Sequence, residues 1–97
     1  MSAGYGTEVA FRLGEGQDQQ ARAVAADLHA AAAGCLGQVL FLNDAGEYGV
    51  LAEWATLAEA EGYAARPATA TILDRLAERL GRRPGVRVYR MERAGPS

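Results

Sequence analysis

The chain opens on a stretch in which apolar and polar positions alternate. The odd positions from Thr7 to Leu13 are the more apolar set, whereas charged side chains stand at Glu8 and Arg12. A period of two residues predicts a β-strand with one face in the core and the other in water. Glycines at positions 14 and 16 then interrupt the pattern, and we expect them to end the strand.

A period of three and four residues replaces the alternation from Gln17 onward. The apolar positions that follow this spacing are Ala21, Val24, Ala25, Leu28, Ala31, Ala32 and Cys35. Such a stripe predicts a helix that buries one face, and Gly34 is its expected stop because glycine accepts the left-handed conformation found after helix ends. Since many of these residues are alanines, we expect a thin core.

Two apolar runs follow, at Leu36 to Asn43 and at Tyr48 to Trp54, and the sequence Asp44-Ala45-Gly46 separates them. A short turn whose glycine can take a positive φ predicts a β-hairpin. If Asn43 faces Glu47, both faces of this hairpin are apolar. One face then carries Leu36, Leu40, Leu42, Tyr48, Val50, Ala52 and Trp54, and the other carries Val39, Phe41 and Leu51.

The following region predicts a helical segment in two parts. Thr56 stands three residues before a glutamate, which is the spacing of a capping box, and Pro67 is expected to end the first part. The second part is expected to start at Thr69 or Thr71 and to stop at Gly81. Its apolar stripe comprises Ile72, Leu73, Leu76, Ala77 and Leu80.

Alternation returns from Val86 to Met91 and predicts a last strand. The full order is then β-α-β-β-α-β, with the second helical segment divided at Pro67. This order is typical of the ferredoxin-like α+β fold, in which an antiparallel four-stranded sheet carries its helices on one face. We expect a single domain over residues 1–97, with a loose tail at residues 94–97.

The central hairpin predicts a homodimer. Two helical crossovers can cover only one face of the sheet, whereas the hairpin is apolar on both faces. A large apolar surface in water is unusual for a monomer. A second copy packed back to back would cover it, because a two-fold interface is self-complementary. The two sheets together would then form an α+β barrel.

Composition excludes several classes of protein. A net charge of −2 gives no long-range attraction to nucleic acid or to an anionic membrane surface. No apolar run is long enough to span a membrane, and the first residues lack the pattern of a secretion signal. The single cysteine, Cys35, forms no internal disulfide, which is typical of cytoplasmic proteins. One histidine without a ligand cluster predicts no metal site, and no haem or flavin is expected.

Four pieces of the sequence, in this order and spacing, resemble the antibiotic biosynthesis monooxygenase family. They are Gly34-Cys35-Leu36, the turn from Asp44 to Gly46, the pair Glu53-Trp54 and the acidic helix after it. The resemblance implies a dimeric α+β barrel. It also implies a cofactor-independent oxygenase acting with dioxygen on an aromatic, anthrone-type polyketide intermediate in secondary metabolism. The alternative is a non-catalytic ligand-binding or cyclase-type accessory dimer of the same fold.

The resemblance matches Trp54 to the tryptophan at the strand end of the family. There it would wall a pocket and stack on a planar substrate; the second interpretation is a core tryptophan. Two family positions differ, because Val50 stands where anthrone oxygenases carry asparagine and Ala60 where they carry tyrosine. Tyr63 is the candidate substitute for that phenol. His29 is either a general base or a solvent-exposed helix residue.

The expected site therefore has two sets of residues. The candidate catalytic residues are Trp54, Tyr63 and His29, and the candidate substrate-binding residues are Tyr48, Val50, Leu40, Arg66, Ile72 and Leu76. They would line an apolar cleft between the sheet and the helices. Seven of the ten arginines lie after residue 74, where they form either a salt-bridged helix face, with Glu78 and Arg82 at a favourable spacing, or a surface for an acidic acyl-carrier partner. Cys35 is either a core residue or a reactive thiol.

Overall fold

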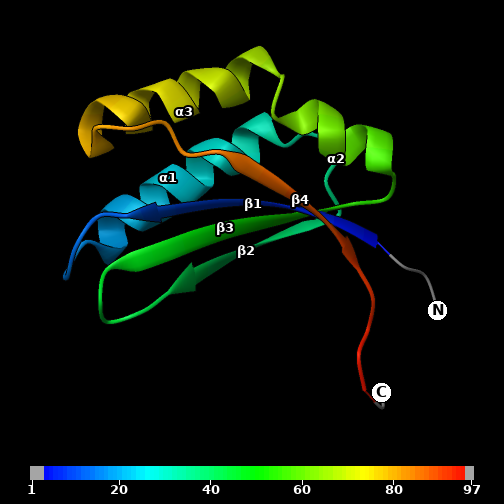
Figure 1. The fold of residues 1–97 in the computed structure, drawn as a ribbon, viewed down its shortest axis with the longest axis horizontal. Helices are drawn as coiled ribbons and strands as arrows, with labels where there is room; N and C mark the ends of the chain where they lie inside the picture. The colour runs from blue at the N-terminus through cyan, green and yellow to red at the C-terminus, as the bar shows by residue number, and fades with distance from the viewer. Residues whose placement is uncertain (1–3, 96–97) are drawn as a thin grey trace.

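The computed structural model describes residues 4–95 and arranges them as a sheet with a layer of helices on one face (Figure 1). In chain order the elements are β1 (Gly4–Arg12), α1 (Asp18–Ala31), β2 (Gly37–Leu42), β3 (Glu47–Trp54), α2 (Leu57–Tyr63), α3 (Pro67–Leu80) and β4 (Val86–Met91). The strand order is β2-β3-β1-β4 and every pair is antiparallel. The predicted ferredoxin-like α+β fold is confirmed.

The core lies between the sheet and the helices. Val9 and Phe11 of β1 face Val50 and Tyr48 of β3 across the sheet, and all four are buried. The helices close this layer with alanines and a few large side chains, above all Leu28, Leu73 and Leu76. The alternation of β1 and the stripes of α1 and α3 therefore bury the faces that their periods predict.

The hairpin has the predicted register, with Leu42 opposite Tyr48 and Leu40 opposite Val50. Its turn glycine, Gly46, has the positive φ of 78° that the turn requires. Leu42 nevertheless remains exposed and Leu40 half-buried, because β2 is the edge strand and the helix layer covers it only in part.

The other face of the sheet is open. Val39, Phe41 and Tyr89 are exposed there at 49%, 50% and 41%, with Leu51 and Met91 half-buried beside them. A side chain at Gly6 would contact both Leu51 and Met91, which places these two on the face of Gly6. Tyr89 is paired with Gly6, and Val39 with Leu51, so they lie on the same face, as does Phe41 two residues after Val39. We call this set the open face, and it includes the second apolar surface that the hairpin pattern predicts.

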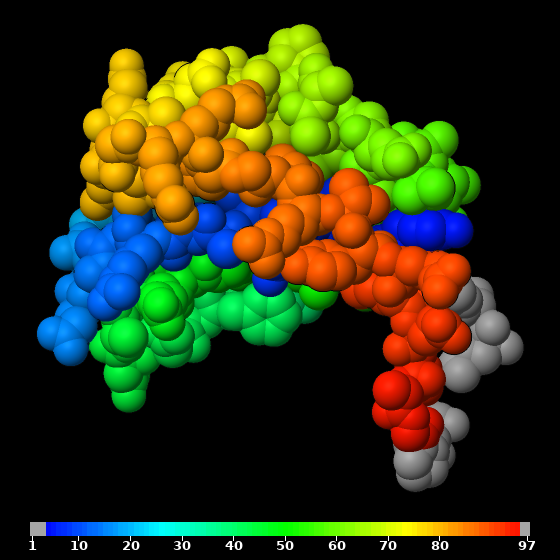
Figure 2. Space-filling view, viewed as in Figure 1, coloured from blue at the N-terminus to red at the C-terminus, as the bar shows by residue number. Residues whose placement is uncertain are grey.

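The strands of the hairpin and the end of β1 differ from their predicted bounds by one residue, and three boundaries differ by more. β1 begins at Gly4, ahead of Thr7, because pairing with both β3 and β4 extends it. α3 begins at Pro67 instead of Thr69 or Thr71, since proline lacks only an N–H that the first helical turn leaves unpaired. α1 ends at Ala31, ahead of the left-handed Gly34. The predicted tail lies partly outside the described residues; residues 92–95 project from the body (Figures 1 and 2).

Candidate functional site

Trp54 ends β3 at the junction of the sheet and the helices. Its ring packs against Tyr63 of α2, with centroids 5.2 Å apart. The side chain is wholly buried, however, and its indole N–H donates to Thr7 Oγ1 at 2.9 Å. The expectation that Trp54 partly lines a cavity is therefore wrong for this structure. The N–H expected for a substrate oxygen already has a buried partner.

Arg66 completes the cluster around Trp54. Its guanidinium lies 5.0 Å from the Trp54 ring centroid and 5.9 Å from that of Tyr63, in cation–π geometry. The same group donates to the carbonyl oxygens of Ala31 and Ala33 at 3.1 and 2.9 Å. Because the last carbonyls of a helix lack intrahelical donors, Arg66 satisfies the end of α1. Its contacts are structural.

Tyr63 is held as a neutral phenol. Burial, reinforced by Cys35, raises its pKa to about 12, although the positive charge of Arg66 opposes the shift. The hydroxyl donates to the carbonyl oxygen of Leu28 at 3.3 Å. A phenolate base at Tyr63 is therefore not present at neutral pH.

The structure brings Trp54, Tyr63 and Arg66 together but leaves His29 outside this cluster, exposed on α1. Val50, Ile72 and Leu76 are buried and fill the space where the sequence analysis expects an apolar cleft, and Leu40 is half-buried at its edge. That cleft is replaced by packed core, because these side chains fit against the helices and against one another.

Tyr48 is buried at the other end of β3, where its hydroxyl donates to Asp18 of α1 at 2.9 Å. Burial and this carboxylate raise the pKa of Tyr48. Cys35 is half-buried against the core. Across residues 4–95, no three histidine, cysteine, aspartate or glutamate side chains are grouped as a metal site would require. None of the described helices is both long and apolar enough to cross a bilayer.

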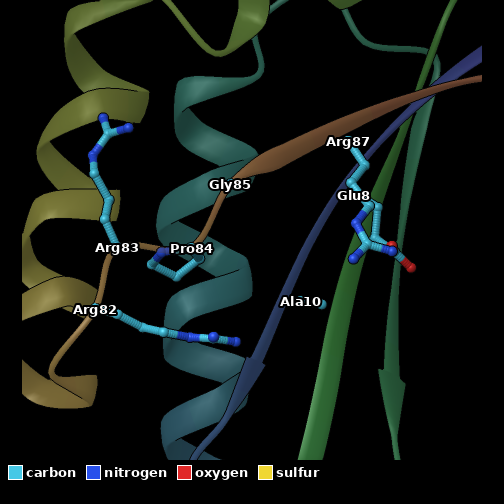
Figure 3. A pocket seen from close by; sticks show the side chains of 7 residues that line it. All are labelled: Glu8, Ala10, Arg82, Arg83, Pro84, Gly85 and Arg87. Atoms are coloured by element: carbon cyan, nitrogen blue, oxygen red, sulfur yellow. The ribbon is translucent and has the colours of Figure 1, made fainter.

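A solvent-accessible groove lies away from Trp54, between β1 and the loop of residues 81–85 that joins α3 to β4 (Figure 3). Three adjoining cavities of about 320, 290 and 410 Å³ share Ala10 and Arg82. We call them together the arginine groove. Its lining residues are Glu8, Ala10, Phe11, Arg12, Glu47, Tyr48, Leu80, Arg82, Arg83, Pro84, Gly85 and Arg87.

The arginines of the groove differ in their partners. Arg83 turns away along α3 (Figure 3) and pairs with Asp74 at 2.9 Å, and Arg12 lies 4.0 Å from Glu47. Arg87 lies opposite Glu8 on the adjacent strand, and a hydrogen bond with Tyr89 together with nearby negative charge raises its pKa. Arg82 reaches across toward β1, and no described side chain lies within hydrogen-bond or ion-pair distance of its guanidinium.

The groove is not predicted from the sequence. From the sequence, the late arginines form either a salt-bridged helix face or a partner surface, and Glu78 and Arg82 are expected to form a helical pair. In the part of the chain that the structure describes, this pair does not form. The physical reason is that α3 ends at Leu80 and Gly81 turns left-handed, so Arg82 leaves the helical spacing. The left-handed glycine immediately before two arginines is the signal that indicates this change of direction.

Several solved structures of similar length share the fold. A candidate antibiotic biosynthesis monooxygenase from Caulobacter crescentus has a TM-score of 0.68 at 15% identity, with 94% of this chain and 92% of that chain covered. Similar candidates from Chloroflexus aurantiacus and Bordetella bronchiseptica have TM-scores of 0.63 and 0.66 at 16% and 15% identity. The first comparison covers 99% of this chain and 98% of that one, and the second covers 91% and 96%.

No protein-family model and no curated protein sequence matches the chain. The solved structures establish its architecture as the ferredoxin-like α+β fold of these candidate monooxygenases. The resemblance predicted from the sequence is thus confirmed at the level of the fold.

Proposed function

We propose that the protein is a ligand-binding member of this fold that holds a small planar aromatic molecule in the arginine groove. The observation that carries the proposal is Arg82, a guanidinium without a described partner beside the apolar Phe11 and Pro84. Binding sites commonly combine an apolar wall with a few polar groups that fix orientation. In contrast, the polar groups of the Trp54 cluster are already engaged within the protein.

The test of this proposal is a titration of ¹⁵N-labelled protein with 2-naphthoate and, separately, with uncharged 2-naphthamide. We expect at least one of these planar probes to move the amide resonances of Ala10, Arg12 and Gly85 in a saturable manner. Resonances of Trp54 and its neighbours should move less. Unchanged groove resonances with both probes would overturn the proposal.

A second candidate function is cofactor-independent oxygenation of an anthrone-type polyketide intermediate by dioxygen. The fold shared with candidate antibiotic biosynthesis monooxygenases favours it. This activity at the expected site would require the core around Trp54 to open and release its N–H from Thr7. An oxygen electrode with dithranol separates the two functions. Oxygen uptake that rises above spontaneous oxidation in proportion to the protein concentration would support the oxygenase. The ligand-binding proposal expects oxygen uptake at the spontaneous rate only. Neither function is proposed to use a metal, haem or flavin.

We also propose that the protein acts as a cytoplasmic homodimer joined through the open face. The exposed Val39, Phe41 and Tyr89 of that face support the proposal, since burying apolar surface is the main driving force for association. By the strand registers, Glu8, Ala10 and Arg87 lie on the same sheet face as the open face, so in a back-to-back arrangement the arginine groove of each copy would adjoin the dimer interface. The dimer would thus carry two ligand sites.

A further inference from the structure

The arginine groove exposes part of the edge of a strand. The ladder between β1 and β4 ends at the pair Val9–Val86. The next positions on the β4 side are Gly85 and Pro84, which belong to the loop and line the groove. Proline has no N–H to donate, so it cannot extend the ladder. Residues 10–12 of β1 consequently extend past the start of β4 and have no paired strand on that side.

The backbone of Ala10 and Arg12 points to that free edge. The N–H of Leu13 donates to Gly46 O on the β3 side, at 3.0 Å. Successive residues of a strand direct their N–H and C=O groups to opposite sides, so those of Arg12 and Ala10 point toward the groove. Within residues 4–95, neither of these two N–H groups donates to a carbonyl of the 81–85 loop. The groove therefore offers two N–H donors on one strand edge.

The charge of the groove suits a single negative group. Arg83 and Arg12 have carboxylate partners, and Arg87 faces Glu8 across the strand pair. Four arginines and three carboxylates lie in or beside the groove, so it carries one net positive charge, and Arg82 has neither a hydrogen bond nor an ion pair among the described side chains. A planar guanidinium matches a carboxylate, which it can bind through two parallel hydrogen bonds.

We propose that the ligand of the arginine groove is a monocarboxylate with an aromatic or similarly flat apolar body. Its carboxylate would accept from Arg82 and from the backbone N–H of Ala10 or Arg12, and its body would lie against Phe11, Leu80 and Pro84. This inference deepens the proposed function and rests on it. Cavities of about 290 to 410 Å³ fit a ligand of one or two rings.

The experiment compares the two naphthalene probes with two variants of equal charge change. Calorimetry and amide shifts are recorded for the parent protein, for Arg82→Gln, and for Arg79→Gln, an exposed arginine on α3 outside the groove. We expect 2-naphthoate to bind at least tenfold more tightly than 2-naphthamide. Arg82→Gln should remove most of this preference, Arg79→Gln should retain it, and the Ala10 or Arg12 amide proton should move downfield with the carboxylate.

Equal binding of the two probes in the groove would overturn the carboxylate inference while leaving the proposed function standing. A carboxylate preference that survives Arg82→Gln, or that both variants reduce equally, would also overturn it. Failure of both probes to reach the groove would instead overturn the proposed function. Folding of each variant is checked by the dispersion of the same amide spectra.

Discussion

Arg66 shows how one side chain ties together three parts of this molecule. Its guanidinium covers the Trp54 ring and donates to the carbonyl oxygens of Ala31 and Ala33 at the end of α1. Arg66 also stands at the N-cap position of α3. A residue that the sequence makes a candidate substrate contact is therefore a link between helices and sheet. Residue identity alone cannot distinguish these roles, since the same guanidinium suits both.

The buried hydrogen bond of Trp54 gives a first prediction. Trp54→Phe keeps most of the apolar volume but leaves the Thr7 hydroxyl buried without its donor. We expect a loss of about 2 kcal/mol in the free energy of unfolding, measured by urea denaturation. Adding Thr7→Val should recover part of that loss. If the single variant is as stable as the parent, the indole N–H is not held as the structure indicates.

The Tyr63 phenol gives a second prediction, for alkaline pH. Its pKa is about 12 in the folded state and near 10 in the unfolded chain. The resulting stabilisation is complete below pH 10 and is lost as the pH rises from 10 toward 12. This difference between the folded and unfolded pKa of Tyr63 corresponds to roughly 3 kcal/mol of the free energy of unfolding. Urea unfolding should show a steeper loss in this window for the parent than for Tyr63→Phe; equal slopes would contradict the account.

At the scale of elements, the sequence predicts every helix and strand, and it fails where side chains meet across elements. The alternation of β1, the hairpin around Gly46 and the Thr56 cap, whose hydroxyl accepts from the Glu59 N–H, are all local patterns. The sealed core around Trp54 depends on how Tyr63 and Arg66 pack from another element. The arginine groove likewise depends on two elements, because β1 continues past the pair Val9–Val86, where its ladder with β4 ends. No period or motif encodes either feature.

Two glycines provide a matched element-scale prediction. Gly46 and Gly81 have nearly equal φ values of 78° and 81°, but a Cβ at Gly46 would overlap the Gly14 backbone whereas one at Gly81 meets open space. Gly81→Ala should cost about 1 kcal/mol through its left-handed conformation alone. We expect Gly46→Ala to cost about 2 kcal/mol more, because the Gly14 backbone must move to accommodate the added Cβ. Thermal or urea unfolding of both variants measures the difference, and equal losses would contradict the close approach.

At the scale of the whole molecule, the open face decides the oligomeric state. Phe41→Glu places a charge in the centre of the proposed interface, where its burial without a partner is costly. Leu57→Glu is the matched control, because Leu57 is exposed to a similar extent on α2. Sedimentation should show a dimer for the parent and the control and a monomer for Phe41→Glu. If the parent protein is a monomer at micromolar concentration, the proposed dimer with two packed sheets is contradicted.

The central claim is that the ligand occupies the arginine groove and not the interior beside Trp54. The most direct measurement is the dissociation constant of 2-naphthoate, by calorimetry, for the parent, Arg82→Gln and Trp54→Phe at a temperature where all three are folded. The account predicts binding at least tenfold weaker for Arg82→Gln and within about twofold of the parent for Trp54→Phe. The reverse order, with binding lost in Trp54→Phe and retained in Arg82→Gln, would contradict it and place the ligand in the core.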